Sequence, residues 1–333
     1  MSNFTLSIIL PIYNVKEYLE RCVKSIEAQS FKDYEVIFVD DGSTDGSGNL
    51  ADDLSKRFKN SQVIHKVNGG LSSARNAGLE VATGEYVFMI DSDDWIEDNA
   101  FETIVKYFKT KPDIIKFNLI RRPDGKRVFS TAEPGVYEKQ AIEDSLLVNA
   151  IEDTGDFIFS AWSHVYKLDF LNKNSLRFVS EREIGSEDYL FNTQTYLCAE
   201  SVIVIEDTIY NYDCRDGSLT QKYRKNLYTQ YIKLHLLMQE AVTKSGKAGK
   251  FSESVAFSFI EKMIGVCIQN ECLKTKDHSL FSGWINTHKM ASSREYKEIM
   301  KMYPYEKGRK SRKILLPLMR IHIVLPTMYL LMR

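Results

Sequence analysis

Strands and helices alternate along the first hundred residues, and this pattern restricts the chain to a small group of folds. Short apolar runs at 6–12, 34–39 and 86–90 have the length and composition of buried strands. Strands that alternate with helices predict a parallel sheet with helices on both faces. Ligands of such sheets bind beyond the carboxyl ends of the strands. The clearest helical spacing lies at Val15, Tyr18, Leu19, Cys22, Val23 and Ile26.

The start of that first helix carries a local signal. Asn14 stands directly before the helical stretch, and Glu17 follows three residues later. This spacing predicts a capping box, in which the two side chains close the N-terminus of the helix.

Composition narrows the classes of function. The chain has 333 residues, of which 44% are hydrophobic and 27% charged, and its net charge is −1. A nearly neutral chain lacks the basic field of a nucleic-acid-binding protein, so we expect no nucleic-acid partner. Five cysteines without a CxxC pair suit a reducing compartment. The first residues lack a basic segment and a long apolar core, so we expect no signal peptide and a cytoplasmic protein.

The regular alternation ends after the first hundred residues. A less regular region follows, then a stretch with helical spacing, and from Lys307 the chain is basic and then apolar. We therefore predict an α/β domain at 1–224, a helical region at 225–306 and a separate tail at 307–333.

Two polar motifs follow predicted strands. VDDGSTDGS (39–47) ends the second strand, and its Asp41 is a candidate to accept a hydrogen bond from a ligand N–H. The alternative is an ordinary turn, since Asp, Gly and Ser are turn formers. NGGLSSARNAGL (68–79) combines glycines, which let backbone approach a ligand closely, with Arg75 in the helix that follows. It matches neither the Walker nor the GxGxxG pattern.

A third motif, DSDD (91–94), comes directly after the apolar run YVFMI. Residues two apart in an extended chain point the same way, so Asp91 and Asp93 can converge on one point. Two carboxylates with open positions suit Mg²⁺ or Mn²⁺, which also takes phosphate oxygens. The alternative is an acidic turn in which Asp94 caps a helix predicted at 97–108.

Four segments in this order and spacing resemble family 2 glycosyltransferases with the GT-A fold: PIYN (11–14), VDDGSTDGS, NGGLSSARNAGL and YVFMIDSDDW (86–95). The resemblance is dense over about the first hundred residues and continues sparsely to about residue 220. It implies an α/β protein with a GT-A-like, Rossmann-type nucleotide-binding sheet and a C-terminal helical extension. Residues 1–100 would bind the nucleotide and 101–224 the acceptor.

The resemblance also implies roles for residues of the donor site. Asp41 would contact the uracil of a UDP-sugar, with Pro11 and Tyr13 beside that base. Asp93 would hold the divalent metal, Mn²⁺ or Mg²⁺, beside the diphosphate, and Asp91 would either join it at the metal or contact the ribose. Such an ion stabilises the negative charge that develops on the leaving UDP. The further positions expected to contact the nucleotide sugar are Asn68, Arg75, Asp91, Ser92 and Arg215.

Glu187 and Asp188 form a second acidic pair, in GSEDYLF. The structural alternative is a helix cap, which Ser186 or Asp188 would supply. The resemblance instead implies that Asp188 is the catalytic base. An inverting transfer needs one carboxylate to deprotonate the acceptor hydroxyl, and Glu187 would support it or bind the acceptor.

The matches beyond these motifs are looser. SAWSHVYKLDFL (160–171) resembles a segment on the acceptor side, which implies Trp162 and His164 there. His164 replaces the usual lysine, and the alternative for Trp162 is core packing. Relatives often have arginine where this chain has Asp213, so Arg215 would take its place.

The tail combines a basic cluster with a mostly apolar segment. The twenty mostly apolar residues of this segment are long enough, as a helix, to span a bilayer. A simple spanning helix is disfavoured by the prolines and polar residues within it: Pro317, Arg320, His322 and Pro326. We expect the tail to associate with an anionic membrane surface. The alternative is a helix packed on the protein or on a partner chain. The basic residues are Lys307, Arg309, Lys310, Arg312 and Lys313.

Together these observations predict an inverting, metal-dependent glycosyltransferase at the cytoplasmic face of a bacterial membrane. It would move a hexose from a UDP-sugar to a glycan or lipid-linked acceptor in cell-surface polysaccharide synthesis. The partners expected are the donor, the acceptor, the membrane surface and, as an open alternative, a second copy of the chain. The rival functions are a sugar-phosphate nucleotidyltransferase and a non-catalytic module that binds a nucleotide sugar or a glycan. Neither the sugar nor the linkage follows from the sequence.

Overall fold

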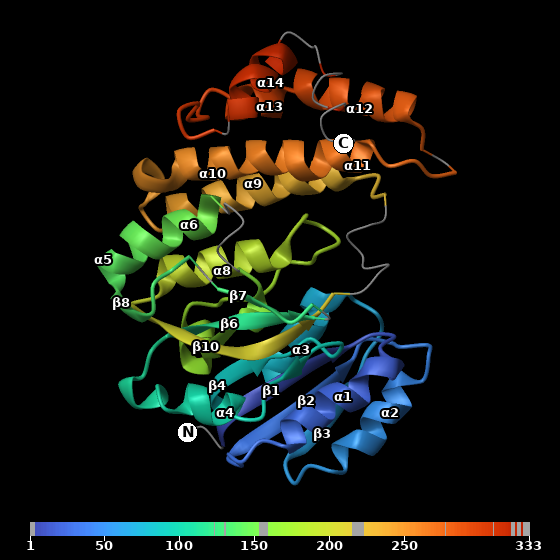
Figure 1. Cartoon of the computed structure of the whole chain (residues 1–333), viewed down its shortest axis with the longest axis vertical. Coiled ribbons are helices and arrows are strands. Elements are labelled where there is room, and N and C mark those ends of the chain that lie inside the picture. The colour runs from blue at the N-terminus through green and yellow to red at the C-terminus, as the bar shows by residue number, and fades with distance from the viewer. Residues whose placement is uncertain are drawn as a thin grey trace. The chain divides into compact units, whose positions relative to one another are not determined.

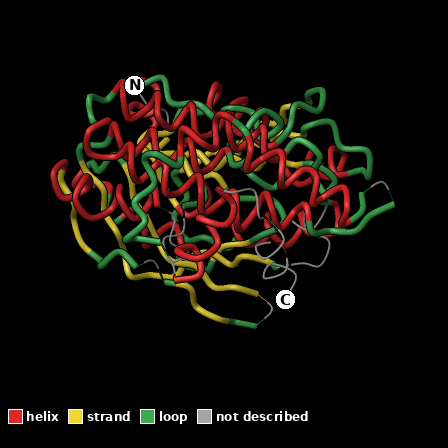
Figure 2. Tube along the Cα trace, turned by 90° about the horizontal axis from the view of Figure 1, so that it is seen from above, coloured by secondary structure: helices red, strands yellow, loops and turns green. Residues whose placement is uncertain are grey.

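The computed structural model describes residues 4–122, 124–129, 131–152, 159–214, 223–276, 278–308, 310–320, 324 and 328. The chain divides into two compact units. Unit 1 comprises Met1–Glu181 and Glu187–Cys214, and unit 2 comprises Arg182–Ser186 and Arg215–Arg333. Among the described residues, strands (yellow in Figure 2) occur only in unit 1, and the elements of unit 2 are helices.

One mixed sheet forms the centre of unit 1. Within the described residues it has ten strands, in the order β3-β2-β1-β4-β9-β6-β10-β5, with β7 on β6 and β8 on β10 (Figure 1). The strands are β1 (Phe4–Ile12), β2 (Tyr34–Asp40), β3 (Ser61–His65), β4 (Gly84–Met89), β5 (Trp95–Ile96), β6 (Ile114–Arg122), β7 (Lys126–Val128), β8 (Gly135–Glu138), β9 (His164–Lys167) and β10 (Ser201–Asp213).

The first four strands confirm the predicted parallel sheet. β1 pairs in parallel with both β2 and β4, and β2 pairs in parallel with β3. Helices α1 (Lys16–Glu27), α2 (Ser47–Ser55) and α3 (Leu71–Val81) make the three crossovers. Because these strands run the same way, the motifs that follow β1, β2 and β4 meet at one edge of the sheet. β9 is antiparallel to β4 and β6, so the second half of the sheet is mixed.

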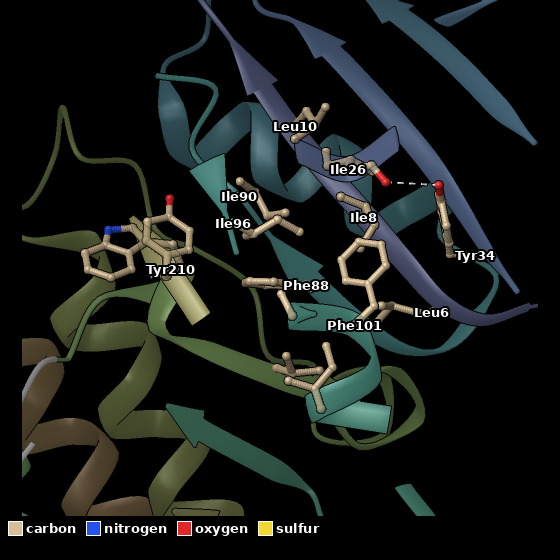
Figure 3. Close-up of a cluster of buried hydrophobic side chains, with 14 of the residues drawn as sticks. Leu6, Ile8, Leu10, Ile26, Tyr34, Phe88, Ile90, Ile96, Phe101 and Tyr210 are labelled. Carbon is tan, nitrogen blue, oxygen red and sulfur yellow. Dashed lines mark hydrogen bonds between the residues drawn. The ribbon is translucent and has the colours of Figure 1, made fainter. Parts of the chain in front are cut away.

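The core of unit 1 follows from the alternation along β1. Leu6, Ile8 and Leu10 are fully buried on one face, where they join Ile26 of α1 and Phe88 of β4 in one apolar cluster (Figure 3). Each such side chain contributes about 1.5–3 kcal/mol when it leaves water. Ile9 faces the other side, where α3 packs so closely that a Cβ on Gly78 would lie 2.4 Å from Cγ2 of Ile9.

The N-terminus of α1 differs from the predicted capping box. Helix α1 starts at Lys16, and neither Asn14 nor Glu17 caps it. The N–H of Val15 donates instead to Oγ of Ser47 (2.9 Å), and the N–H of Lys16 donates to Oδ2 of Asp45 (3.1 Å). Asn14, in the left-handed region with φ 52°, accepts from the N–H of Thr44. The capping-box prediction is wrong because the loop after β2 supplies the caps from elsewhere in the sequence.

The remaining described helices of unit 1 flank the second half of the sheet. They are α4 (Ala100–Val105), η1 (Phe108–Thr110), α5 (Lys139–Ala141), the π-helical turn η2 (Ile142–Leu146), α6 (Leu147–Glu152), η3 (Ala161–Ser163), α7 (Leu168–Lys173) and α8 (Glu187–Cys198). The helix predicted at 97–108 therefore begins later, at Ala100, and its N-cap position is Asn99.

Unit 2 is helical where it is described, as the spacing beyond residue 225 predicts. The elements are α9 (Leu227–Lys244), α10 (Ala248–Lys262), the π-helical turn η5 (Met263–Ile268), α11 (Gln269–Glu271), α12 (Leu280–Ser292), α13 (Arg294–Ile299) and α14 (Lys310–Arg320). Within the described residues, none of the helices combines the length and the apolarity needed to cross a bilayer.

The predicted tail packs inside unit 2 where it is described. Leu315, Leu316 and Met319 of α14 are at most 4% exposed. Nε of Arg312 lies 3.0 Å from Oε2 of Glu261 in α10, and the side chain of Arg312 is only 11% exposed. One of the five basic residues is therefore used inside the unit. The tail is not the separate segment that its composition suggests, and these contacts favour the packed-helix alternative.

Candidate active site

The ends of β1, β2 and β4 bring the predicted donor residues to one edge of the sheet. Ile12 of β1 lies opposite Asp40 of β2, and the N–H of Ile90 bonds to the carbonyl of Ile9. The hydroxyl of Ser92 donates to the carbonyl of Pro11, so the turn after β4 is fastened directly to β1. Pro11 and Ser92 are both buried. They thus shape the backbone of this edge.

Asp41 organises the glycine loop that follows β3. Its buried carboxylate accepts from the N–H groups of Gly69 (2.9 Å) and Gly70 (2.7 Å) and from Nζ of Lys66 (2.6 Å). Nδ2 of Asn68 donates to the backbone carbonyl of Asp41. Charge-assisted bonds of this kind hold the loop firmly. Two of them fall on Oδ1 and one on Oδ2, so by lone-pair count Oδ2 retains capacity for a ligand donor.

The neighbouring Asp40 has a different task. It is buried, and it accepts from the N–H of Ser43 and from Nδ1 of His65 (2.9 Å). Burial alone would raise the pKa of Asp40, but the hydrogen bonds from His65 and Ser43 outweigh it and lower the pKa. The two aspartates of the DDGS motif therefore shape the turn and the glycine loop respectively.

Arg75 is the centre of a charged cluster at this edge. Its guanidinium is 1% exposed and lies 2.8 Å from Oδ1 of Asp91, 2.6 Å from Oδ1 of Asp188 and 3.7 Å from Oε1 of Glu187. The carboxyl groups are 16–22% exposed, so they border solvent while the cation does not. The structure thus joins residues that the sequence places in three separate motifs.

One cation facing three carboxyl groups leaves an excess of negative charge. The excess is smaller if one of the acids binds a proton. Burial first, and then the charge of Asp188, raise the pKa of Glu187 to about 7. Burial also raises the pKa of Asp188, although Arg75 works against this shift. A carboxyl group with a raised pKa can act as a proton acceptor near neutral pH.

The residue directly before α8 is Ser186, so the helix-cap alternative stays open for Ser186 and does not fit Asp188. Asp188 lies in the first turn of α8, and its Oδ1 accepts from Nη1 of Arg75. Asp94 is not a cap for the helix after DSDD either, because that helix begins after Asn99. Asp94 is 1% exposed, and it accepts from the hydroxyl of Tyr210 (2.7 Å) and from the N–H of Asp213 (2.7 Å). The prediction that Asp94 caps the helix after DSDD is therefore wrong, because its carboxylate bonds to Tyr210 and Asp213 instead.

Several contacts at this edge are absent from the sequence predictions. Burial first, and then the charge of Asp91, raise the pKa of Asp94 to about 8. Arg21 of α1 donates to the carbonyl of Asp93 (2.6 Å) and to Oδ2 of Asp213 (2.5 Å), and it covers the ring of Trp95 at 3.9 Å. These bonds tie the DSDD turn to the end of β10. The sequence singles out Asp213 but predicts none of these contacts.

The predicted acceptor residues lie in an aromatic part of unit 1. Trp162 is 7% exposed and stacks on Tyr210 (4.5 Å between ring centroids) and on Tyr212 (5.4 Å). His164 is fully buried, with Nδ1 at 2.9 Å from the carbonyl of Ser160 and Nε2 at 3.0 Å from the hydroxyl of Tyr196. Burial lowers the pKa of His164 well below its usual value. These surroundings are those of core packing, and the acceptor role of both residues stays a prediction.

The remaining predicted positions divide into two groups. Tyr13 follows the last residue of β1 and is 51% exposed. The N–H of Asp41 donates to the carbonyl of the preceding residue, Ile12 (2.9 Å). Arg215 and much of the loop beyond it lie outside the described residues. The prediction for Arg215 therefore stays open.

The acidic turn is compatible with a hard divalent cation but does not enclose one. Within the described ranges, no three His, Cys, Asp or Glu side chains are grouped so that they could hold a metal ion. Mg²⁺ is commonly held by one or two carboxylates, with substrate phosphates and water as the other ligands. The chain at DSDD is not extended, contrary to the expectation from its sequence: Ser92 and Asp93 form a turn in which the N–H of Asp94 donates to the carbonyl of Asp91 (3.0 Å). The convergence of Asp91 and Asp93 on one ion therefore stays a prediction.

Comparisons with known proteins agree with this geometry. The chain is 36% identical over 222 residues to the glycosyltransferase GlyA of Streptococcus pneumoniae, a match that covers 65% of this chain and 31% of GlyA. It is 29% identical to the poly(ribitol-phosphate) beta-glucosyltransferase of Bacillus spizizenii, over 64% of this chain and 33% of that protein. The chain thus spans about a third of the length of these two relatives.

Solved structures give the fold. The crystal structure of S. aureus TarS residues 1–349 in complex with UDP has a TM-score of 0.71 at 18% identity, covering 98% of this chain and 90% of that chain. A complex of the same TarS segment with UDP-GlcNAc matches equally, with a TM-score of 0.71. The GT-A fold expected from the sequence is thereby confirmed. Residues 7–175, half of the chain, match the family described as Glycosyl transferase family 2, and the chain belongs to that glycosyltransferase family.

Proposed function

We propose that the chain is an inverting glycosyltransferase that moves a hexose from a UDP-sugar to a glycan acceptor. The observation that carries the proposal is the position of Asp188. Its carboxylate borders solvent at the edge where the strands end, it has a raised pKa, and Arg75 fixes its orientation. A proton acceptor so placed is what a transferase needs and a passive binding module does not.

The donor assignment rests on the first half of the sheet. TarS is solved with UDP and with UDP-GlcNAc, which supports a uridine nucleotide as the donor of this chain. Oδ2 of Asp41 accepts one hydrogen bond, from Gly70, and would accept a second from a base N–H. Tyr13, which is 51% exposed just after β1, offers a ring on which a base could stack. Asn68 and the backbone of Gly69 and Gly70 would line the same part of the site.

In the proposed reaction, the acceptor hydroxyl attacks the anomeric carbon from the face opposite the diphosphate. Asp188 accepts the hydroxyl proton as the new C–O bond forms, and the bond to the diphosphate oxygen breaks. Arg75 keeps the Asp188 carboxylate in place and favours its ionised form. Glu187, whose pKa of about 7 leaves it partly protonated at neutral pH, would bind an acceptor hydroxyl beside the base.

Asp91 and Asp93 would hold Mn²⁺ or Mg²⁺ beside the diphosphate. A bound ion of this kind stabilises the charge on the departing UDP. The role of this chain is to present the two carboxylates on a turn that Tyr210 and Arg21 fasten to β10.

The acceptor and the location are proposed on coarser grounds. The poly(ribitol-phosphate) beta-glucosyltransferase among the relatives supports an acceptor in cell-surface polysaccharide synthesis, including a lipid-linked one. A cytoplasmic enzyme at the inner face of the membrane remains the prediction from the sequence. The buried side of α14 leaves only its exposed residues, such as Lys313, for a membrane surface.

A panel of nucleotide sugars tests the proposal, with UDP release measured in the presence of Mn²⁺, Mg²⁺ or EDTA. We expect one UDP-sugar to stand out and Asp188→Asn to lower its turnover by roughly 10²–10⁴-fold, while UDP binding stays near wild type. Asp53→Asn, an exposed carboxylate in α2, is the matched control. Turnover of Asp188→Asn within about threefold of wild type would reject the base. UDP binding without release from any donor would favour the binding module.

A further inference from the structure

Helix α3 holds a distant stretch of chain, residues 178–181, along its first two turns. Nδ2 of Asn76 donates to the carbonyl of Phe178 (2.9 Å), and Oδ1 of Asn76 accepts from the N–H of Phe178 (2.9 Å). The hydroxyl of Ser72 donates to the carbonyl of Val179 (3.0 Å) and accepts from the N–H of Glu181 (3.2 Å). One face of the SSARN motif is therefore occupied by this stretch.

Glu181 adds an unusual cap. Its Oε1 accepts from the N–H of Leu71 and its Oε2 from the N–H of Ser72, both at 3.1 Å. The first turn of a helix carries N–H groups without partners in the helix and a partial positive charge, which a carboxylate satisfies. The space comes from Gly70, since a Cβ there would lie 1.8 Å from Oε1 of Glu181.

The same helix also holds Asp188. Arg75 lies between Ser72 and Asn76 in α3 and reaches Asp188 with Nη1. Its guanidinium also lies 5.3 Å from the ring centre of Phe178, and that ring stacks on Phe191 of α8 at 3.9 Å. The side chains of α3 thus touch both the stretch at 178–181 and the start of α8.

The contacts of α3 with Glu181 and with Asp188 fix the chain on both sides of a short excursion. The chain leaves unit 1 after Glu181 and returns to it at Glu187. Glu187 and Asp188 are therefore the first residues after a re-entry, where backbone is anchored less than in the middle of an element. The two ends of that excursion are fixed to one rigid helix, by Glu181 on one side and by Asp188 on the other.

We propose that Glu181 is a positioning residue for the catalytic base Asp188. By capping α3, its carboxylate fixes the chain that leads to α8 and with it the distance between Arg75 and Asp188. Glu181 itself touches neither donor nor acceptor in this assignment. The inference rests on the proposed function, because the residue being positioned is the proposed base.

Kinetics give the first test, with Glu181→Ala and the matched control Asp113→Ala. Asp113 also accepts from two backbone N–H groups, those of Glu200 and Ser201. It lies at the amino ends of β6 and β10, whereas the proposed site lies at the carboxyl ends of β1, β2 and β4. Both variants lose a carboxylate that caps backbone. We expect kcat for UDP release from the preferred donor to fall about 10²-fold in Glu181→Ala, as a small misplacement of a catalytic group produces, and the Kd for UDP to change little. Asp113→Ala should keep its kcat.

Hydrogen exchange gives a second test that needs no donor. The amides at the start of α8 should exchange faster in Glu181→Ala than in wild type, and not in Asp113→Ala. Unchanged protection at 190–193, the first amides of α8 with partners inside the helix, would overturn the inference, as would a folded Glu181→Ala variant with wild-type kcat. If Asp188→Asn also kept full turnover, the proposed base would fail. If Glu181→Ala kept wild-type turnover while Asp188→Asn lost it, only the positioning role of Glu181 would be rejected.

Discussion

Nη1 of Arg75 lies 2.6 Å from Oδ1 of Asp188, while Nη2 of the same guanidinium lies 2.8 Å from Oδ1 of Asp91. One buried cation therefore links the proposed base to the acidic turn proposed to hold the metal. This link makes the geometry of the base dependent on the turn after β4. These ion pairs differ from ordinary surface pairs because the side chain of Arg75 is only 1% exposed.

Replacement of Arg75 should destabilise the protein as well as inactivate it. Arg75→Met leaves three carboxyl groups without their cation, and loss of one partner of a buried pair costs about 3–5 kcal/mol. Urea unfolding measures this change. Arg57→Met is the control, since Arg57 pairs with Glu20 in an exposed position and its loss should leave the unfolding curve unchanged. Equal stability of the two variants would contradict the central role of Arg75.

The raised pKa values predict how activity depends on pH. A general base works when it is deprotonated, and a raised pKa keeps Asp188 protonated to a higher pH than an ordinary aspartate. We therefore expect kcat/KM to rise with pH along a limb that lies above pH 4, the usual range of the group. Because Glu187 and Asp188 interact, this limb belongs to the pair. A profile that stays flat down to the usual aspartate range would contradict this assignment.

Asp94 should make stability depend on pH. Its pKa is raised to about 8 in the folded protein and lies near 4 in the unfolded chain, so the folded state binds the proton more tightly. The stabilisation is complete below about pH 4 and is lost as the pH rises toward 8. Asp94→Asn keeps an acceptor for the N–H of Asp213 and cannot ionise. Between pH 5 and pH 8 the melting temperature of this variant should fall less than that of wild type. An equal fall in melting temperature in both proteins would show that Asp94 is not the group responsible.

The sequence predicts the first half of the fold well because the signals there are local. Three of the first four strands, β1, β2 and β4, are buried apolar runs followed by polar motifs, whereas β3 is short and partly exposed. The cap of α1 was mispredicted because Asp45 and Ser47 reach it from the next loop. The Arg75–Asp188 pair could not be predicted from spacing, since it depends on how the chain returns to α3. Asp94 shows the same limit, because its partners Tyr210 and Asp213 come from the far strand β10.

The tail offers the clearest contrast between composition and structure. Arg312 and Lys313 are neighbours in the same basic cluster, yet Arg312 is buried against Glu261 and Lys313 is exposed. The two residues therefore allow the packing and the membrane interpretations to be tested separately. Arg312→Met should destabilise the protein by about 3 kcal/mol, because it leaves Glu261 without its cation in a largely buried position. Lys313→Met should leave stability unchanged.

Removal of the whole tail should have a larger effect. A chain ending at Glu306 loses the buried side chains of Leu315, Leu316 and Met319 and exposes the surface that they cover. We expect it to melt well below wild type or to aggregate, as measured by thermal denaturation. If α14 also binds a membrane, Lys313→Met should weaken sedimentation with anionic vesicles while the melting temperature stays constant. A truncated chain as stable as wild type would contradict the packed-helix interpretation and favour a tail that is separate from the rest of the protein and binds a membrane.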